Sequence, residues 1–393
     1  MRISKGSPEL VTVYDPSKTY EGYTLFAPWG DTKAWLVDMH GRFVHCWTMS
    51  HIPGENCYLL PSGNLLYSGK DLKGPVMIGG AGGLLMEADW EGNIPWLHED
   101  AYMHHDFCRM ENGNTMVLRW VQVPPELAAK VKGGVPGTER KGVMWTDAYR
   151  EVTPAGKVVW EWNGYEHLDV ELDTICPLCA RAEWTHANSC FVMPNGDVMT
   201  TCRSTDDILI IDKRTGDIRW RWGKGILAHP HNPTLLENGN ILVYDNGNHR
   251  RLHPLDYSRV VEVNPSTRKI EWEYKAKSLD DFYSSIVSSA QRLPNGNTLI
   301  CEGHPGRVFE VTREGEMVWE FTNPFYYPHE MFGPSNQIFR AYRYGPDFPG
   351  LRGKVLDPDR FQWTVWDKRQ RAGGSAGADG SDSVEWCGGG EKQ

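Results

Sequence analysis

The sequence predicts an all-β fold, a six-bladed β-propeller of four-stranded antiparallel blades with two loop insertions. The 17 Trp and 41 Gly residues are typical of short, aromatic-rich strands joined by many tight turns. Two sub-motifs alternate along the chain, and each recurs six times. A length of 393 residues would suggest two or three domains in an ordinary chain, but a repeat fold of this length is one unit.

The first sub-motif is an apolar run, a turn, and a strand that ends in aromatic residues. In the copy AWLVDMHGRFVHCW the last residue is Trp47, and other copies end in Trp-x-Trp, Trp-x-Tyr or Trp-x-Phe. This repeated ending predicts that aromatic side chains fill the seams between blades. The six copies span residues 34–47, 83–97, 149–162, 208–222, 259–274 and 307–321.

The second sub-motif is a strand, a tight turn of the Asn-Gly type, and a second strand. Asn-Gly suits a two-residue hairpin because both central residues need positive φ. One copy of each sub-motif gives the four strands of a blade. The chain begins with the first sub-motif and ends with the second, so its two ends are predicted to complete one shared blade, which leaves no free sheet edge. The copies span residues 56–69, 105–120, 188–203, 231–247 and 289–303, with a degenerate copy at 329–344.

The domain boundaries follow from these repeats. Residues 1–19 are predicted to be an N-terminal arm, residues 20–371 the propeller, and residues 372–393 a disordered tail rich in Gly, Ser and acidic residues. Two insertions interrupt the repeat, at 121–143, where PPELAAKVKGG could form a short helix, and at 163–185. Long loops in a compact repeat fold are often lids or binding elements.

The overall composition limits the kinds of partner that the protein is expected to bind. A formal net charge of −10 argues against a nucleic-acid surface. No run of about 18 apolar residues is present, so we expect no membrane span. The N-terminal segment has no apolar core of the kind found in signal peptides, so we expect a cytoplasmic protein with reduced thiols. Cys176 and Cys179 form a single pair with no second pair nearby, which favours a local disulfide or two free thiols over zinc. The oligomeric state stays open.

Polar residues recur at one point of the repeat, before the turn of the second sub-motif. His105, Asn188 and His231 each precede their hairpin Asn by seven residues. His104 precedes it by eight, and His186, like His229, by nine. In a propeller this strand is the innermost one, so matched positions in different blades should converge on one channel. Gly79 to Gly83, by contrast, are predicted to form only a turn before a strand.

Arg203 follows the second strand of the hairpin that starts with His186 and Asn188, so it should lie beside them. The competing interpretation is a surface ion pair with Asp206 or Asp207. The planar fork of Arg suits oxyanions, so the channel is predicted to bind a small aromatic or anionic substrate carrying a sulfuryl, phosphoryl or carboxylate group. His304 is assigned to the same channel, with Glu302 as an alternative partner. Loop position suggests four aromatic wall residues: Trp120, Trp184, Phe282 and Tyr283.

These segments resemble the arylsulfate sulfotransferases over roughly residues 20–350. The stretch Trp184-Thr-His-Ala-Asn-Ser189, followed by Arg203, is similar to that family's His-x-Asn and downstream Arg. His231-Asn-Pro-Thr, which leads to Asp245-Asn246-Gly247, resembles the segment that bears the nucleophilic histidine of the family. His104-His105-Asp106 resembles an earlier family histidine.

The resemblance implies a ping-pong transfer of a sulfuryl group from an aryl sulfate to a phenol, without a nucleotide donor or other cofactor. It implies that His231 is the nucleophile that forms a sulfohistidine, and that His105 is the acid and base. It also implies that further groups bind the substrate and stabilise charge on the sulfuryl group. The predicted substrate-binding residues are His186, Asn188, Arg203, His104 and His304.

Two alternatives remain open at this point. A metal-dependent lyase or hydrolase could use His105, His186 and His231 as ligands of a divalent metal. Asn188 and Arg203 are oxyanion-binding groups rather than usual metal ligands, which argues against it. The second alternative is a non-catalytic interaction scaffold, which has little reason to line a channel with histidines.

Overall fold

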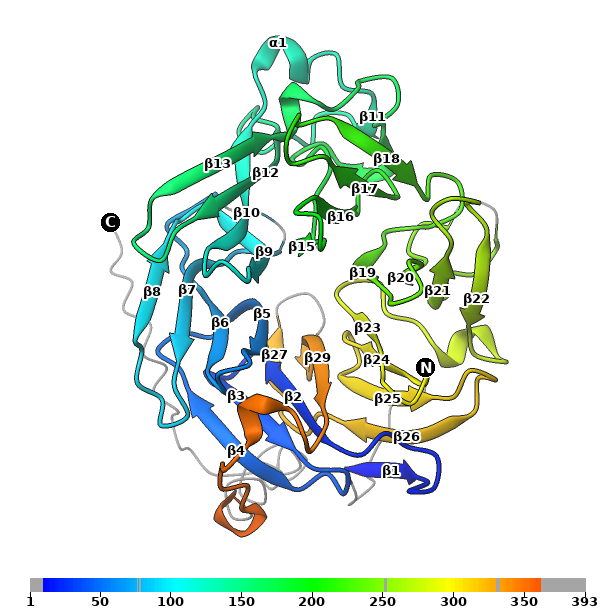
Figure 1. Ribbon diagram of the computed structural model, residues 1–393. Helices are drawn as coiled ribbons and strands as arrows, with labels where there is room; N and C mark the ends of the chain where they lie inside the picture. Colours follow the sequence, from blue (N-terminus) through cyan, green and yellow to red (C-terminus); the bar gives the residue numbers. More distant parts are fainter. Residues whose placement is uncertain (1–9, 76, 78, 251–252, 330–332, 362–393) are drawn as a thin grey trace, which may run out of the picture.

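Six antiparallel sheets are arranged in a ring around a central axis, as the sequence predicts (Figure 1). The computed structural model describes residues 10–75, 77, 79–250, 253–329 and 333–361, so the predicted tail at 372–393 lies outside the described residues. Each of these sheets is one blade, in which the strands follow one another from the centre of the ring to its outside (Figure 1). The blades are numbered 1 to 6 in chain order. None of the helices in this part of the chain is both long and apolar enough to cross a membrane.

Four blades are built from four consecutive or nearly consecutive strands. Blade 2 contains β5 (Pro53–Leu59), β6 (Leu65–Lys70), β7 (Gly83–Ala88) and β8 (Trp96–Glu99). Blade 3 contains β9 (Met103–Arg109), β10 (Thr115–Gln122), β12 (Trp145–Val152) and β13 (Val158–Asn163). Blade 4 contains β15 (Phe191–Val192), β16 (Val198–Cys202), β17 (Asp207–Ile211) and β18 (Ile218–Trp222). Blade 5 contains β19 (His231–Leu235), β20 (Ile241–Asp245), β21 (Arg259–Val263) and β22 (Ile270–Tyr274).

The predicted N-terminal arm contributes a strand to blade 6. β1 (Val11–Tyr14) pairs with the outer strand β26, which makes this sheet five-stranded. The other strands of blade 6 are β23 (Ser289–Arg292), β24 (Thr298–Glu302), β25 (Arg307–Val311) and β26 (Met317–Thr322). Short 3₁₀ helices join or follow strands at η1 (Gly164–Glu166), η2 (Leu279–Asp281), η3 (Pro349–Leu351) and η4 (Pro358–Phe361).

The two chain ends share blade 1, which confirms the predicted closure of the ring. Its innermost strand, β29 (Ile338–Tyr344), pairs with β2 (Tyr23–Pro28), and β3 (Lys33–Val37) and β4 (Phe43–Thr48) follow outward. The two chain ends share the four strands differently from the prediction. The N-terminal side supplies three strands, and only one strand of the 329–344 copy enters the blade. His329 ends β27 (Tyr327–His329), which pairs with β28 (Gly333–Ser335) in a separate two-stranded sheet. Pro328 and Pro334 face each other there, and proline cannot donate to a ladder within a blade.

The indole rings occupy the seams between blades, as predicted. Trp160 of blade 3 donates its Nε1–H to the carbonyl of Lys213 in blade 4 (2.9 Å), and Trp220 of blade 4 donates to Pro265 in blade 5 (3.0 Å). Each outer strand thus fixes a turn of the next blade, while its ring packs on the apolar core between the two sheets. The same contact is made by Trp47 to Asp89, Trp96 to Pro154, Trp272 to Arg313 and Trp319 to Met39.

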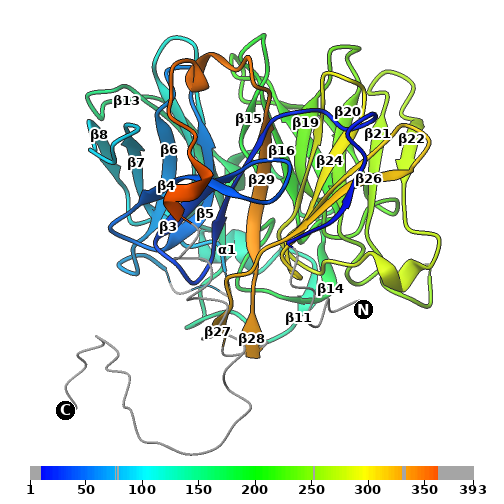
Figure 2. The same ribbon diagram turned by 90° about the horizontal axis from the view of Figure 1, so that it is seen from below.

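The two predicted insertions meet on one face of the ring. The predicted short helix is a single turn, α1 (Pro125–Ala128). The strand β11 (Gly133–Val135) of the first insertion pairs in parallel with β14 (Ile175–Ala180) of the second. Figure 2 shows β11, β14, β27 and β28 beyond the same edge of the blades. The insertions therefore cover one mouth of the channel.

Below that mouth, a buried ion pair ties the innermost segments of four blades. Arg340 of blade 1 donates to Asp106 of blade 3 (2.9 Å) and to the carbonyl of Asn188 in blade 4 (2.9 Å). Asp106 also accepts from the Nδ2 of Asn56 in blade 2 (2.7 Å) and from the backbone N–H of Cys190 in blade 4 (2.7 Å). The side chains of Arg340 and Asp106 are only 3% and 4% exposed, so solvent does not replace these bonds.

Substitution of Arg340 by Met should lower the free energy of unfolding by about 3–5 kcal/mol, because Asp106 is left as an uncompensated buried charge. Equilibrium denaturation in urea measures this loss. The matched control is Arg42→Met, which removes a more exposed ion pair to Asp38 and should cost no more than about 1 kcal/mol. Equal losses in the two variants would show that the central pair does not hold the blades together.

Candidate active site

A cavity of about 410 Å³ lies at the covered mouth of the channel. The structure brings four of the predicted residues together in its wall: His105, His186, Arg203 and His231. They come from blades 3, 4 and 5, up to 126 positions apart in the sequence. The insertion strand β14 and the residues after it close one side of the cavity.

Backbone irregularity at the inner strands aims these side chains into the channel. His105 and His186 have positive φ, 51° and 49°, a region that residues other than Gly rarely adopt and that is costly unless the surroundings enforce it. The pairing of β9 with β10 and of β19 with β20 also shifts register next to His105 and His231. Such irregularities re-aim side chains near active sites.

The tautomer of His231 is set by its neighbours. Its Nδ1 lies 2.7 Å from Oδ1 of Asn246 and 3.2 Å from the carbonyl oxygen of His229. The amide of Asn246 is held in this orientation, because its Nδ2 donates to the carbonyls of Ser284 and Val287. Both neighbours of Nδ1 are acceptors, so Nδ1 carries the proton and Nε2 of the neutral ring keeps its lone pair.

His104 and His105 form a linked pair. Their Nδ1 atoms are 2.8 Å apart, so one ring donates to the other. Nε2 of His104 lies 3.3 Å from the carboxylate of Asp147, and its ring stacks on Trp120. Burial and the nearby charge of His186 lower the pKa of His105 well below its usual value. His104 does not line the cavity, so it positions His105 rather than contacting substrate.

Glu183 holds His186 from behind. Its carboxylate lies 2.6 Å from Nδ1 of His186 and accepts the indole N–H of Trp120 at 2.7 Å. Burial by itself would raise the pKa of Glu183, but the adjacent His186 lowers it below the usual value. The ionised carboxylate can only accept, so Nδ1 of His186 carries a proton. The rings of His186 and His105 lie 4.9 Å apart in the cavity wall.

Arg203 is the cation of this cavity. Its Nη1 lies 3.8 Å from Sγ of Cys179, and no ion pair joins it to a carboxylate among the described residues. The alternative predicted partners are engaged elsewhere: Asp206 accepts the backbone N–H of His229, and Asp207 accepts the hydroxyl of Thr205. The guanidinium therefore keeps donors for an anion in the cavity.

Two further predicted substrate-binding residues, like His104, lie outside the cavity. Asn188 is fully buried, and its amide donates to the carbonyl of Pro230 (2.9 Å) and accepts from the hydroxyl of Thr201 (2.5 Å), so it supports the segment before His231 instead. Nδ1 of His304 lies 3.2 Å from the hydroxyl of Ser285, which lines the cavity where His304 does not. Glu302, its predicted alternative partner, pairs with Arg307. The predicted aromatic wall residues also do not line the cavity: Trp120, Trp184, Phe282 and Tyr283.

Sequence reasoning missed Glu55 and Gly80. Glu55 lies in the cavity wall, where burial raises its pKa to about 7, and its Oε1 accepts the N–H of Gly80 at 3.1 Å. It stands seven residues before Ser62, the first residue of a Ser-Gly turn, so the same register would have found it. Gly80 packs against the His105 ring so closely that a Cβ would lie 2.0 Å from Cε1. The predicted turn before a strand is therefore also part of the site.

A metal set made of His105, His186 and His231 is not found among the described residues. The group of His, Cys, Asp and Glu side chains that does bring its ligand atoms within 4.8 Å of one another lies beside the cavity. It consists of Cys176, Cys179, His229 and His249. Cys179 and His249 are also part of the cavity wall.

Solved structures show distant likenesses. A protein of unknown function from Bacteroides caccae has 14% sequence identity and a TM-score of 0.53, over 82% of this chain and 100% of that chain. A streptogramin B lyase has 11% identity and a TM-score of 0.46, over 80% of this chain and 86% of that chain. Virginiamycin B lyase from Staphylococcus aureus has 14% identity and a TM-score of 0.39, over 68% and 69%. The first likeness is one of fold alone, and the two lyases are too distant to support an argument about this chain.

The family comparison is more specific than the structural one. The arylsulfotransferase (ASST) family matches residues 74–324, a range that contains His105, His186, Arg203 and His231. No curated protein matches the sequence. Because the family match spans well over half of the 393 residues, the resemblance predicted from the motifs is confirmed, and the chain belongs to the arylsulfotransferase (ASST) family.

Proposed function

We propose that this protein transfers a sulfuryl group from an aryl sulfate to a phenol through a covalent intermediate on His231. The observation that carries the proposal is the fixed tautomer of His231, which presents an unprotonated Nε2 in the same cavity as Arg203. Membership of the arylsulfotransferase family supports the reaction class. A cavity of about 410 Å³ is in the size range of small-molecule sites.

In the first half-reaction, Nε2 of His231 attacks the sulfur of the aryl sulfate. The N–S bond forms, the bond between sulfur and the aryl oxygen breaks, and the phenolate leaves with the electron pair. His105 gives its Nε2 proton to that oxygen while its Nδ1 takes a proton from Nδ1 of His104 across their 2.8 Å contact, so the His105 ring stays neutral. Sulfation of Nε2 puts positive charge on the ring of His231, and the Nδ1–H bond to Asn246 stabilises it.

The second half-reaction reverses these events with a new acceptor. His105, now without its Nε2 proton, takes the proton of an incoming phenol and returns its Nδ1 proton to His104, and the phenol oxygen attacks the sulfur. The N–S bond breaks, and its electron pair returns to Nε2 of His231. Arg203 donates to the sulfuryl oxygens in both half-reactions, with His186 held beside them by Glu183. The proposed transfer needs no cofactor.

The test uses the purified full chain with p-nitrophenyl sulfate. Nitrophenolate release should depend on added phenol, and phenyl sulfate should form in equal amount. Acid-free quenching of enzyme incubated without phenol, followed by peptide mass spectrometry, should find one added sulfuryl group on the peptide that contains His231. Nitrophenolate release that does not depend on phenol would overturn the proposal. So would the absence of a sulfuryl group from every histidine-containing peptide.

A further inference from the structure

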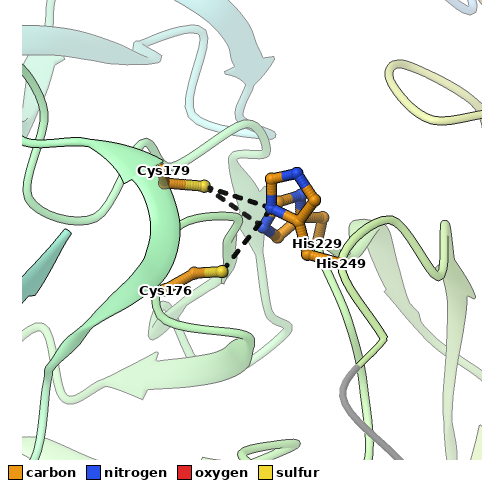
Figure 3. Close-up of side chains that lie close together, drawn as sticks. All are labelled: Cys176, Cys179, His229 and His249. Carbon is orange, nitrogen blue, oxygen red and sulfur yellow. Dashed lines mark hydrogen bonds between the residues drawn. The ribbon is translucent and has the colours of Figure 1, made fainter. Parts of the chain in front are cut away.

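Two thiols and two imidazoles converge beside the cavity, outside the groups that the proposed transfer uses. Cys176 and Cys179 project from the insertion strand β14, and Figure 3 shows them pointing toward His229 and His249. His229 precedes β19, and His249 follows β20. Both cysteines are free thiols, which is one of the two predicted alternatives, and no disulfide joins them. Among the residues that the structure describes, this is the group whose ligand atoms lie mutually within 4.8 Å.

The spacings fit a tetrahedral metal centre. Bonds of about 2.3 Å to sulfur and about 2.05 Å to nitrogen, at the tetrahedral angle, put S and N about 3.6 Å apart. In the structure, Sγ of Cys176 lies 3.6 Å from Nδ1 of His249, and Sγ of Cys179 lies 3.3 Å from Nε2 of His229 and 3.8 Å from Nδ1 of His249. Two sulfurs and two imidazole nitrogens at this spacing are a ligand set typical of zinc.

The surroundings also suit a bound cation. Cys176, Cys179 and His229 are buried, at 1%, 7% and 0% exposed, so water does not compete for their ligand atoms. The other ring nitrogen of His229 lies 3.2 Å from the side-chain amide of Asn248. A half-turn of that amide lets its oxygen accept from Nδ1–H, the proton that a ring bound through Nε2 must carry. The amide nitrogen then donates to Tyr283, whose hydroxyl donates to Asp256.

We propose that Cys176, Cys179, His229 and His249 bind one Zn²⁺ ion that fastens the insertion to the propeller. All four positions of a tetrahedral ion are filled by protein, which is the pattern of a structural rather than a catalytic zinc. The ion joins β14, which closes one side of the cavity, to the segments on either side of the β19–β20 hairpin. His229 lies two residues before His231, so the ion also fixes the backbone that carries the proposed nucleophile.

Metal analysis of the full chain, purified without chelator from zinc-supplemented cells, tests this proposal directly. We expect one zinc per chain. His249→Ala, which alters the half-buried ligand, and Cys176→Ser should each reduce the zinc content to below about a tenth of an equivalent at sub-stoichiometric free zinc. The matched controls are Cys46→Ser, a half-buried cysteine elsewhere, and His105→Ala, a cavity histidine outside the cluster. Both should keep the full equivalent.

Cobalt substitution of the unaltered chain keeps the test independent of whether a variant folds. Tetrahedral Co²⁺ with two thiolates should show intense visible d–d bands and a sulfur-to-cobalt charge-transfer band. Zinc-free wild-type protein without these bands after addition of Co²⁺ would overturn the proposal. Loss of zinc from His105→Ala but not from Cys176→Ser would also overturn it, since the metal would then lie among the channel histidines.

The fastening role has its own readout, which does not depend on activity. Removal of zinc by a chelator should speed proteolytic cleavage within residues 163–185 several-fold, and added Zn²⁺ should restore resistance. Cleavage that is unchanged by the chelator would refute the fastening role. Neither readout uses an aryl sulfate, so failure of the sulfuryl transfer and failure of the zinc site are told apart.

Discussion

The His231→Ala variant should lose phenol-dependent sulfuryl transfer, with kcat/KM lowered on the order of 10⁴-fold or more, because no bond to sulfur can then form at this position. The variant should still fold, since the ring faces the cavity rather than the apolar core between blades. Steady-state release of nitrophenolate in the presence of phenol measures the loss. Peptide mass spectrometry of the variant should find no sulfuryl group on the segment around residue 231.

The control for this variant is His304→Ala. His304 lies near the same mouth of the channel but outside the cavity wall, so its loss should leave kcat/KM within a few-fold of wild type. Zinc content should be measured in both variants, because His231 lies so close to His229 in the chain. Phenol-dependent turnover by His231→Ala with zinc retained would exclude His231 as the nucleophile.

The fold was predictable because its signals are local and repeated. The Trp-x-aromatic endings and Asn-Gly turns each report on one blade, and the six copies of each sub-motif in which such endings and turns recur indicate the architecture. The division of blade 1 was not predictable from the repeat. Residues 23–28 precede the first recognisable copy, and whether the prolines at 328 and 334 leave the blade depends on pairing that the sequence does not display.

The position of a residue before the hairpin Asn predicted a site residue only where the local backbone turns that side chain toward the channel. His105 and Asn188 share one register, yet only His105 reaches the cavity. In blade 3 the positive φ falls at His105 itself, whereas in blade 4 it falls at His186, two residues earlier, and Asn188 turns into the protein. Counting residues locates the strand end, but the local backbone conformation determines which side chain enters the channel, and it differs between blades: in blade 5 His229 has positive φ, yet His231 lines the cavity.

The cysteine pair shows a different limit. Cys176 and Cys179 have no cysteine or histidine pair close by in the sequence, so the local pattern favours free thiols or a disulfide. Their partners are His229 and His249, 50 and 70 positions beyond Cys179. The β11–β14 sheet brings the insertion over blades 4 and 5, and no local motif encodes that approach.

Arg203 offers the second large effect, because it is the cavity cation that a sulfuryl group would meet. Arg203→Met should lower kcat about 10²–10³-fold, the usual cost of removing one donor to a developing oxyanion, with a smaller change in KM. Arg203→Lys should recover part of kcat, since it restores the charge without the planar fork. Separate determination of kcat and KM with p-nitrophenyl sulfate and phenol distinguishes this stabilisation of the transition state from simple substrate binding.

The matched control is Arg219→Met, which removes a half-exposed ion pair to Asp197 on the same blade and should leave kcat unchanged. Arg203 also lies 3.8 Å from Sγ of Cys179, so zinc content must be measured in Arg203→Met. If kcat falls while zinc is retained, the fall is due to the missing contact between Arg203 and the sulfuryl oxygens. A disturbed cavity wall would lower the zinc content as well. Arg203→Met with wild-type kcat would mean that the histidines alone balance the charge, and the mechanism would then have to place the sulfuryl oxygens against His186.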